Sequence, residues 1–180
     1  MSAASDPTSN VEPFLKKIIS TLDNQFITSP SQYQNNVQLF KASILPQLKQ
    51  QSAVIINGSP YASKTQLQEI WSNLPISQHQ LTSYDTHLIP GSGTFIISCS
   101  LKVRFDESGK TRLGESAELV QNNSHTGNTN VAVVKLWSSW YGVNLNLVVD
   151  EIISSNTDVE SINSFNYRFT YKPENSIISL

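Results

Sequence analysis

The spacing of apolar residues changes its period near the middle of the chain. In the first half, apolar positions recur every three or four residues, which is typical of amphipathic helices. This spacing predicts helices over roughly 11–23, from Ser29–Pro30 to Pro46, and from Ser63 to Leu74. A short run of β-branched residues at 53–58 predicts one strand between the second and third helices.

From residue 78 onward the period is two, which is typical of strands with one buried face. Strands are predicted over 78–88, 94–106, 136–153 and 162–172. Helices that come first and long strands that follow favour an α+β fold. We therefore expect three helices packed on one face of a bent antiparallel sheet.

Two segments lack any periodicity. Residues 1–10 are small and polar, so we expect a disordered tail. Residues 107–135 are rich in Asn, Ser, Thr and Gly and are too long for an ordinary connection, so we expect a long flexible loop. The remaining chain, 11–180, is predicted to form a single domain, because 180 residues suffice for one hydrophobic core.

Composition narrows the possible functions. The net charge is −2 and no basic stripe is visible, which disfavours a domain that holds nucleic acid by itself. The single cysteine, Cys99, excludes an internal disulfide and is expected to be a buried thiol. No secretory signal and no apolar run of membrane-spanning length occur, so we expect an intracellular protein without membrane insertion.

Motifs for cofactors are incomplete. Gly91 and Gly93 are not followed by a third glycine at the required spacing, and "SGKT" (108–111) has Arg104 where a phosphate loop requires its first glycine. The histidines and the cysteine show no metal-ligand spacing. We therefore expect no cofactor and no metal.

A catalytic interpretation rests on Asp85 and His87. They lie two positions apart, so a regular strand would place them on the same face. A carboxylate and an imidazole in a dry pocket could perform general acid–base catalysis. A lone pair identifies an active site only weakly, and we favour the interpretation that both residues are solvated polar groups.

Polar residues also alternate with apolar ones on the last two strands. Asn144 and Asn146 alternate with aliphatic residues, and Asn166, Arg168 and Thr170 alternate with aromatic residues. A sheet face of this composition is typical of a polar-rimmed protein interface. It is equally typical of a solvated face, and the pattern by itself leaves both possibilities open.

Four stretches of the chain resemble one known family. They are "DTHLIPGSGT" (85–94), "KVRFDESG" (102–109), "LWSSWYG" (136–142) and "FNYRFTYKPE" (165–174). Together they are similar to the fungal mRNA transport regulators, the small subunits of the heterodimeric mRNA export receptor. The resemblance covers most of the chain, and the order of helices in the first half agrees with it.

The resemblance implies the cone-shaped fold of nuclear transport factor two, with three helices on a strongly curved antiparallel sheet. It also implies a non-enzymatic adaptor that pairs through its sheet with the large receptor subunit. The heterodimer would carry messenger RNA, and also the large ribosomal subunit, through nuclear pores by contacts with Phe-Gly nucleoporins. The protein would then shuttle between nucleus and cytoplasm.

On this basis Asn144, Asn146, Asn166, Arg168 and Thr170 are the predicted partner interface. The long loop differs in composition from a basic RNA-binding segment, because its cations are balanced by glutamates. These charged residues are Lys110, Arg112 and Lys135 against Glu107, Glu115 and Glu118. Two alternatives stay open: a small-molecule isomerase or dehydratase on the same fold that uses Asp85 and His87, and a self-associating scaffold.

Overall fold

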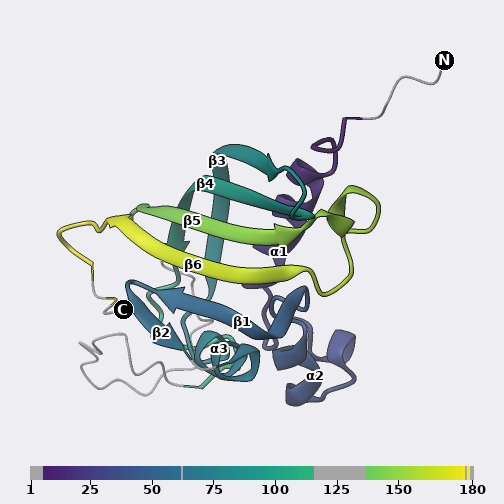
Figure 1. Ribbon diagram of the computed structural model, residues 1–180. Helices are drawn as coiled ribbons and strands as arrows, with labels where there is room; N and C mark the ends of the chain where they lie inside the picture. Colours follow the sequence, from purple (N-terminus) through teal and green to yellow (C-terminus); the bar gives the residue numbers. More distant parts are fainter. Residues whose placement is uncertain (1–5, 62, 116–136, 177, 179–180) are drawn as a thin grey trace, which may run out of the picture.

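The computed structural model describes residues 6–61, 63–115, 137–176 and 178. Within these residues, three α-helices and six strands make up the fold (Figure 1). The helices are α1 (Val11–Leu22), α2 (Val37–Ala42) and α3 (Lys64–Ser72), with short 3-10 helices η1 (Pro30–Tyr33) and η2 (Glu151–Ser154). The strands are β1 (Leu48–Ile56), β2 (Ser59–Tyr61), β3 (Ser77–Ile89), β4 (Thr94–Phe105), β5 (Tyr141–Asp150) and β6 (Ile162–Tyr171).

The six strands form one sheet in the order β2-β1-β6-β5-β4-β3. All neighbours are antiparallel except β1 and β6, which run parallel, so the sheet is mixed rather than purely antiparallel as expected. These two strands are joined where they begin. The backbone N–H groups of Ser161 and Ile162 both donate to the carbonyl of Gln47, which ties the starts of β1 and β6 together.

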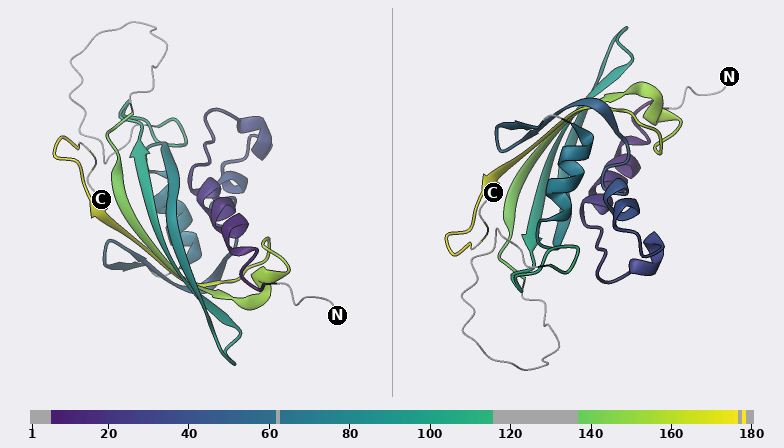
Figure 2. Two further views of the ribbon diagram at one scale, coloured as in Figure 1. Left: turned by 90° about the horizontal axis from the view of Figure 1, so that it is seen from above. Right: turned by 90° about the horizontal axis from the view of Figure 1, so that it is seen from below.

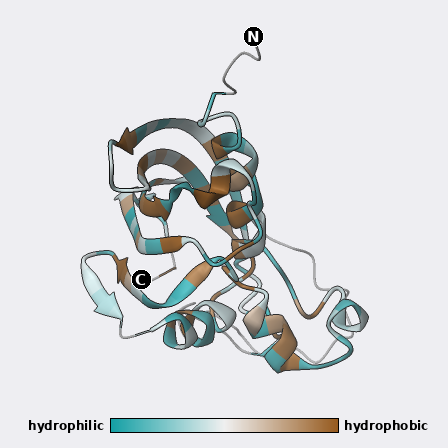
Figure 3. Ribbon diagram, turned by 45° about the vertical axis from the view of Figure 1, so that its right-hand side comes forward, coloured by the Kyte–Doolittle hydropathy of each residue, from teal (hydrophilic) through white to brown (hydrophobic). Residues whose placement is uncertain are grey.

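The described helices cover one face of the curved sheet, and none of them lies on the other face (Figure 2). The α1 stripe predicted from the sequence is buried against the sheet, together with the inward positions of β4 and β5. Along the strands, apolar and polar residues alternate visibly (Figure 3). The buried members of this alternation in β4 are Phe95, Ile97, Cys99, Leu101, Val103 and Phe105. The expectation of a buried Cys99 is confirmed.

The second predicted helix is interrupted. The chain forms η1, then places Gln34 and Asn35 in the left-handed region with φ of 53° and 55°, and only then begins α2. Asn36 caps α2 by accepting from the backbone of Gln38 at 2.9 Å, whereas Ser29 makes no side-chain cap. At α3, which begins close to the predicted Ser63, the Ser63 hydroxyl caps the helix by accepting from the backbone N–H of Gln66 at 3.2 Å.

The predicted tail and loop lie partly outside the described residues, namely at 1–5 and 116–136. The described part of the tail is attached to η2, because Asn10 donates to the carbonyl of Ser154 at 2.5 Å and the Ser154 hydroxyl donates to Pro7. The described part of the loop, 107–115, folds back onto the domain. Within the described residues, no helix is long and apolar enough to cross a membrane.

Candidate functional site: the outer sheet face

Asp85 and His87 lie on the face of the sheet that carries no helices, which we call the outer face. In the β3–β4 register they stand opposite Ser98 and Ile96, whose side chains are exposed while the flanking β4 residues are buried. Their side chains are 75 % and 72 % exposed, and they lie 3.2 Å apart. The pair points away from the cone interior, so it lacks the dry pocket that the catalytic interpretation needs.

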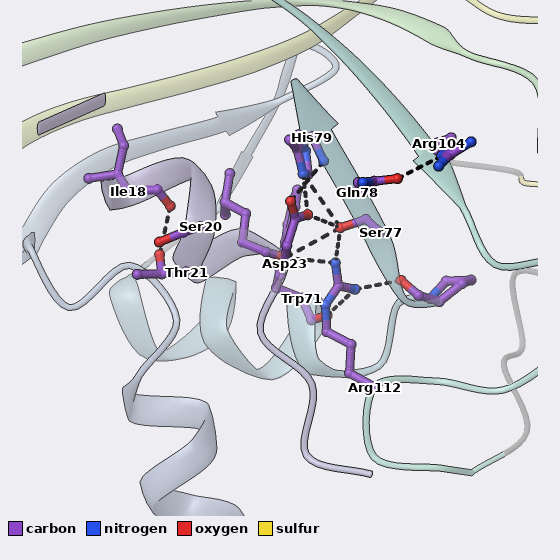
Figure 4. Close-up of polar contacts among 12 residues, drawn as sticks. Ile18, Ser20, Thr21, Asp23, Trp71, Ser77, Gln78, His79, Arg104 and Arg112 are labelled. Atoms are coloured by element: carbon purple, nitrogen blue, oxygen red, sulfur yellow. Dashed lines mark hydrogen bonds and ion pairs between the residues drawn. The ribbon is translucent and has the colours of Figure 1, made fainter. Parts of the chain in front are cut away.

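The interior of the cone holds a different polar cluster (Figure 4). His79 Nδ1 lies 2.5 Å from Asp23 Oδ1, and His79 Nε2 lies 2.8 Å from the hydroxyl oxygen of Tyr167. The backbone N–H of His79 and the hydroxyl of Ser77 also donate to the Asp23 carboxylate. The Tyr167 ring packs edge-on against Trp71, with ring centroids 5.3 Å apart. The space that a ligand would need is therefore occupied by side chains.

Arg112 closes this interior cluster. Its side chain is fully buried and donates to the carbonyls of Leu22, Trp71 and Pro75 at 2.8, 3.2 and 2.7 Å. It also donates to the hydroxyl of Ser77 at 2.5 Å. Burial lowers the pKa of Arg112 to about 10, opposed by the Asp23 carboxylate, so the guanidinium is charged at neutral pH. One cation thus joins the ends of α1 and α3 to the start of β3.

Sequence reasoning missed this cluster. The sequence places Arg112 among the charges of the long loop, and nothing in that aperiodic segment signals burial. The one available signal was Tyr167, because a tyrosine on a core face needs a partner for its hydroxyl group. Among the described residues, no group of His, Cys, Asp and Glu is arranged to hold a metal ion.

The five predicted interface residues share the outer face. Asn144 stands opposite Arg168, and Asn146 stands opposite Asn166, across the β5–β6 pairing. Asn146 accepts from Ser98 of β4 at 2.8 Å and donates to Asn144 at 2.5 Å. The result is a continuous polar row over three strands.

Two of these residues project further than the others. Arg168 and Thr170 are exposed, whereas the three asparagines are half-buried. Thr170 lies directly over Gly142, where an added Cβ atom would come within 2.8 Å of its hydroxyl oxygen. The outer face also presents Ile96, which is 41 % exposed. A bare face with polar rows and an exposed aliphatic residue is a candidate surface for a partner.

Comparison with known proteins decides the family. The sequence profile of the family described as "Nuclear pore RNA shuttling protein Mtr2" matches residues 5–180. The chain belongs to the Mtr2 family. It is 49 % identical to the mRNA transport regulator MTR2 of Candida albicans, over 97 % of this chain and 98 % of that one. It is 36 % identical to the protein of the same name from Saccharomyces cerevisiae, over 93 % and 89 % of the two chains.

Solved structures agree with the Mtr2 assignment. Crystalline Candida albicans Mtr2 superposes with a TM-score of 0.77 at 45 % identity, over 95 % of this chain and all of that one. Mtr2 in complex with the Mex67 M domain, from the same organism, gives 0.76 at 44 % identity, with the same coverage. A Salmonella enterica protein of the nuclear transport factor 2 superfamily, at 0.52 and 10 % identity over 97 % of both chains, shares the fold alone. The predicted family and fold are confirmed, and the family is one of mRNA transport regulators.

Replacing Arg112 should destabilise the domain strongly. Arg112→Met removes four buried hydrogen bonds donated by a charged group, and one such bond contributes about 1.5–3 kcal/mol. We expect the free energy of unfolding, measured by urea denaturation, to fall by about 3 kcal/mol or more. Lys110→Met, at an exposed position two residues earlier, is the matched control and should change little. Equal stability of the two variants would contradict the anchoring role of Arg112.

The Asp23 cluster should make stability depend on pH in the acid range. Burial acts to raise the pKa of Asp23, but hydrogen bonds and the charge interaction from His79 outweigh it and leave the pKa below 3.8. A group with a lowered pKa stabilises the fold fully at pH values above the pKa that it has in the unfolded chain. This stabilisation is lost as pH falls through the lower pKa that Asp23 has in the folded protein. Urea midpoints measured from pH 7 to pH 3 should therefore fall more steeply for the wild type than for Asp23→Asn. Parallel curves would show that Asp23 contributes no such term.

Proposed function

We propose that this chain is a non-enzymatic subunit of an mRNA export receptor that pairs, through its outer face, with a Mex67-type large subunit. The observation that carries the proposal is the outer face, on which no helix of the described residues lies although it spans the long strands β3 to β6. Hydrogen bonds join Ser98, Asn146 and Asn144 there, so the face presents polar groups in a defined arrangement. A relative at 44 % identity that was crystallised with the Mex67 M domain supports a partner of this kind.

The composition of the outer face fits a protein partner. Interfaces combine a core that excludes water with polar groups that fix orientation. Here Ile96 supplies exposed aliphatic surface, and the asparagine row supplies donors and acceptors held by the sheet. Arg168 is exposed and lies beside Asn144, where it can form a charge-assisted hydrogen bond with a partner carboxylate.

Co-purification tests the proposal directly. The full chain should form a one-to-one complex with the Candida albicans Mex67 M domain when the two are co-expressed, as judged by size-exclusion chromatography with mass measurement. The chain on its own is the reference sample. A chain that remains unpaired, or that forms a complex of two identical copies in the presence of the M domain, would favour the self-associating scaffold.

Reversing the charge of Arg168 should weaken this complex. Arg168→Glu removes the cation and places a negative charge against any partner carboxylate. The resulting repulsion lowers the affinity of the heterodimer more than a charge change at the edge of the interface would. We expect the dissociation constant, measured by titration calorimetry, to rise by at least about tenfold. Lys16→Glu makes the same charge change on α1, away from the outer face, and should leave affinity near that of the wild type. Equal affinities would remove Arg168 from the interface.

Messenger RNA would be carried by the heterodimer rather than by this chain alone. The net charge is −2, and phosphate binding depends on many cations. The large ribosomal subunit is a second cargo that the same heterodimer would carry through nuclear pores. We expect the isolated chain to bind RNA weakly and with strong salt dependence, as the electrostatic origin of such binding requires.

Pore passage would come from weak apolar contacts with Phe-Gly repeats. Trp71 cannot supply them, because it is only 1 % exposed and packs in the core. We expect the heterodimer to bind an immobilised Phe-Gly repeat segment with fast exchange and modest affinity. Replacing the repeat phenylalanines by serine should abolish the surface-plasmon-resonance signal. An assembled heterodimer that ignores intact repeats would contradict the transport role.

A further inference from the structure

Cations are distributed unevenly between the two faces of the molecule. On the helices and β1, lysines are matched by carboxylates of the same chain. These ion pairs are Lys16–Glu12, Lys17–Asp158, Lys41–Glu69, Lys49–Asp150 and Lys64–Glu160. On the outer face, Lys102, Arg104 and Arg168 form no ion pair with any described carboxylate. Among the described residues, Lys110, Lys172 and the buried Arg112 also form no ion pair, but Lys102, Arg104 and Arg168 are the ones that share the face proposed for pairing.

The three unmatched cations gather at one end of the outer face. β4 and β6 run in the same direction on either side of β5, and all three residues lie in the second halves of these strands. Arg168 stands opposite Asn144, and Lys102 stands opposite Gly142. At the other end, where β4 begins, the aliphatic Ile96 pairs with Val148, and the exposed Asp85 and His87 of β3 lie beside them, so this end carries a carboxylate and no lysine or arginine of the three. The outer face is therefore divided into a cationic end and an aliphatic end.

Arg104 is held in a fixed orientation. Its guanidinium carbon lies 4.9 Å from the ring centroid of Trp137 and 4.8 Å from that of Trp140. Its Nε donates to the side chain of Gln78 at 2.8 Å. Stacking on two indole rings stabilises the cation and limits its rotamers, so less conformational entropy is lost when a ligand binds. An arginine restrained in this way, without a carboxylate of its own, is suited to receive one from outside.

We propose that the cationic end, formed by Lys102, Arg104 and Arg168, binds carboxylate side chains of the partner domain and sets the orientation of the heterodimer. The aliphatic end, around Ile96 and Val148, packs on aliphatic side chains of the same domain. This inference rests on the proposed function and adds to it the chemistry that the partner must present. A partner rotated by half a turn on the outer face would place its acidic groups over isoleucine and leave the three cations unmatched.

A protein carboxylate fits the cationic end better than an RNA backbone does. RNA requires a run of cations that follows the phosphates, whereas here three cations are spread over two strands among amides, small hydroxyl groups and the two indole rings that contact Arg104. The acidic side chains that follow Arg104 are Asp106 and Glu107. Asp106 is buried and forms no ion pair with a described cation, and burial together with Asp106 raises the pKa of Glu107, with no cation lowering it. Arg104 is therefore not already neutralised from the described part of the loop.

Titration calorimetry of the full chain with the Candida albicans Mex67 M domain, at about 50 and 300 mM salt, tests the inference. The double variant Lys102→Gln, Arg104→Gln removes two cations and keeps polar side chains. We expect its affinity to fall by about tenfold or more at low salt, and its salt dependence to be weaker than that of the wild type. The matched control is Lys16→Gln, Lys17→Gln on α1, which should stay within about twofold because its exposed ion pairs contribute little.

Arg104→Lys separates charge from orientation. It keeps the cation but loses the planar group that stacks between the two rings, so we expect an intermediate loss of affinity. A cooperative thermal melt, followed by circular dichroism, verifies that each variant is folded. Because Lys102 is exposed, the single variant Lys102→Gln carries the test even where a change at Arg104 disturbs the fold.

Two results would overturn the inference while the proposed function stands. In the first, the wild type binds the M domain and the double variant binds with the same affinity and the same salt dependence. In the second, the double variant still pairs normally, but its heterodimer loses binding to a 20-nucleotide poly(U) probe, which would assign the cationic end to RNA. A wild-type chain that does not bind the M domain at all would instead refute the proposed function.

Discussion

The buried guanidinium of Arg112 is the interaction on which the rest of the structure depends. It binds the carbonyl groups at the ends of α1 and α3 and holds the described start of the long loop against β3. Four hydrogen bonds from the two Nη atoms of Arg112 and the charge of the nearby Asp23 carboxylate stabilise this buried cation, while its Nε has no hydrogen-bond partner among the described residues. The interior of the cone is consequently closed by polar contacts of this chain itself.

Because the interior is filled, the outside of the fold is the surface available for recognition. The cone fold places side chains from its helices and its sheet around one interior, where an enzyme would hold its substrate. Here Trp71, Tyr167 and Arg112 fill that interior, while Asp85 and His87 lie in solvent on the other side of the sheet. What remains for recognition is the helix-free outer face, which suits an adaptor that works by pairing.

The two faces of the sheet arise from the same alternation. Along β4 and β5, one residue in two contributes to the core and the next contributes to the outer face, so the positions of Leu145 and Asn144 cannot be changed independently. A shift of register by one residue would bury the asparagines and expose the leucines. The core therefore fixes the geometry of the proposed interface, and rigid backbone rows present Arg104, Arg168 and their neighbours in constant relative positions.

Local periodicity determined much of this protein. The amphipathic stripe of α1, the cap of Ser63 and the alternation of β4 follow from short-range rules, and so does the common face of Asn144, Asn146, Asn166, Arg168 and Thr170. Contacts between distant segments were decided only by the tertiary structure. The parallel pairing of β1 with β6, the burial of Arg112 beside Asp23, and the stacking of Arg104 between two tryptophans each join residues far apart in the chain. No pattern within one segment encodes such contacts, because their energy exists only after the segments have been brought together.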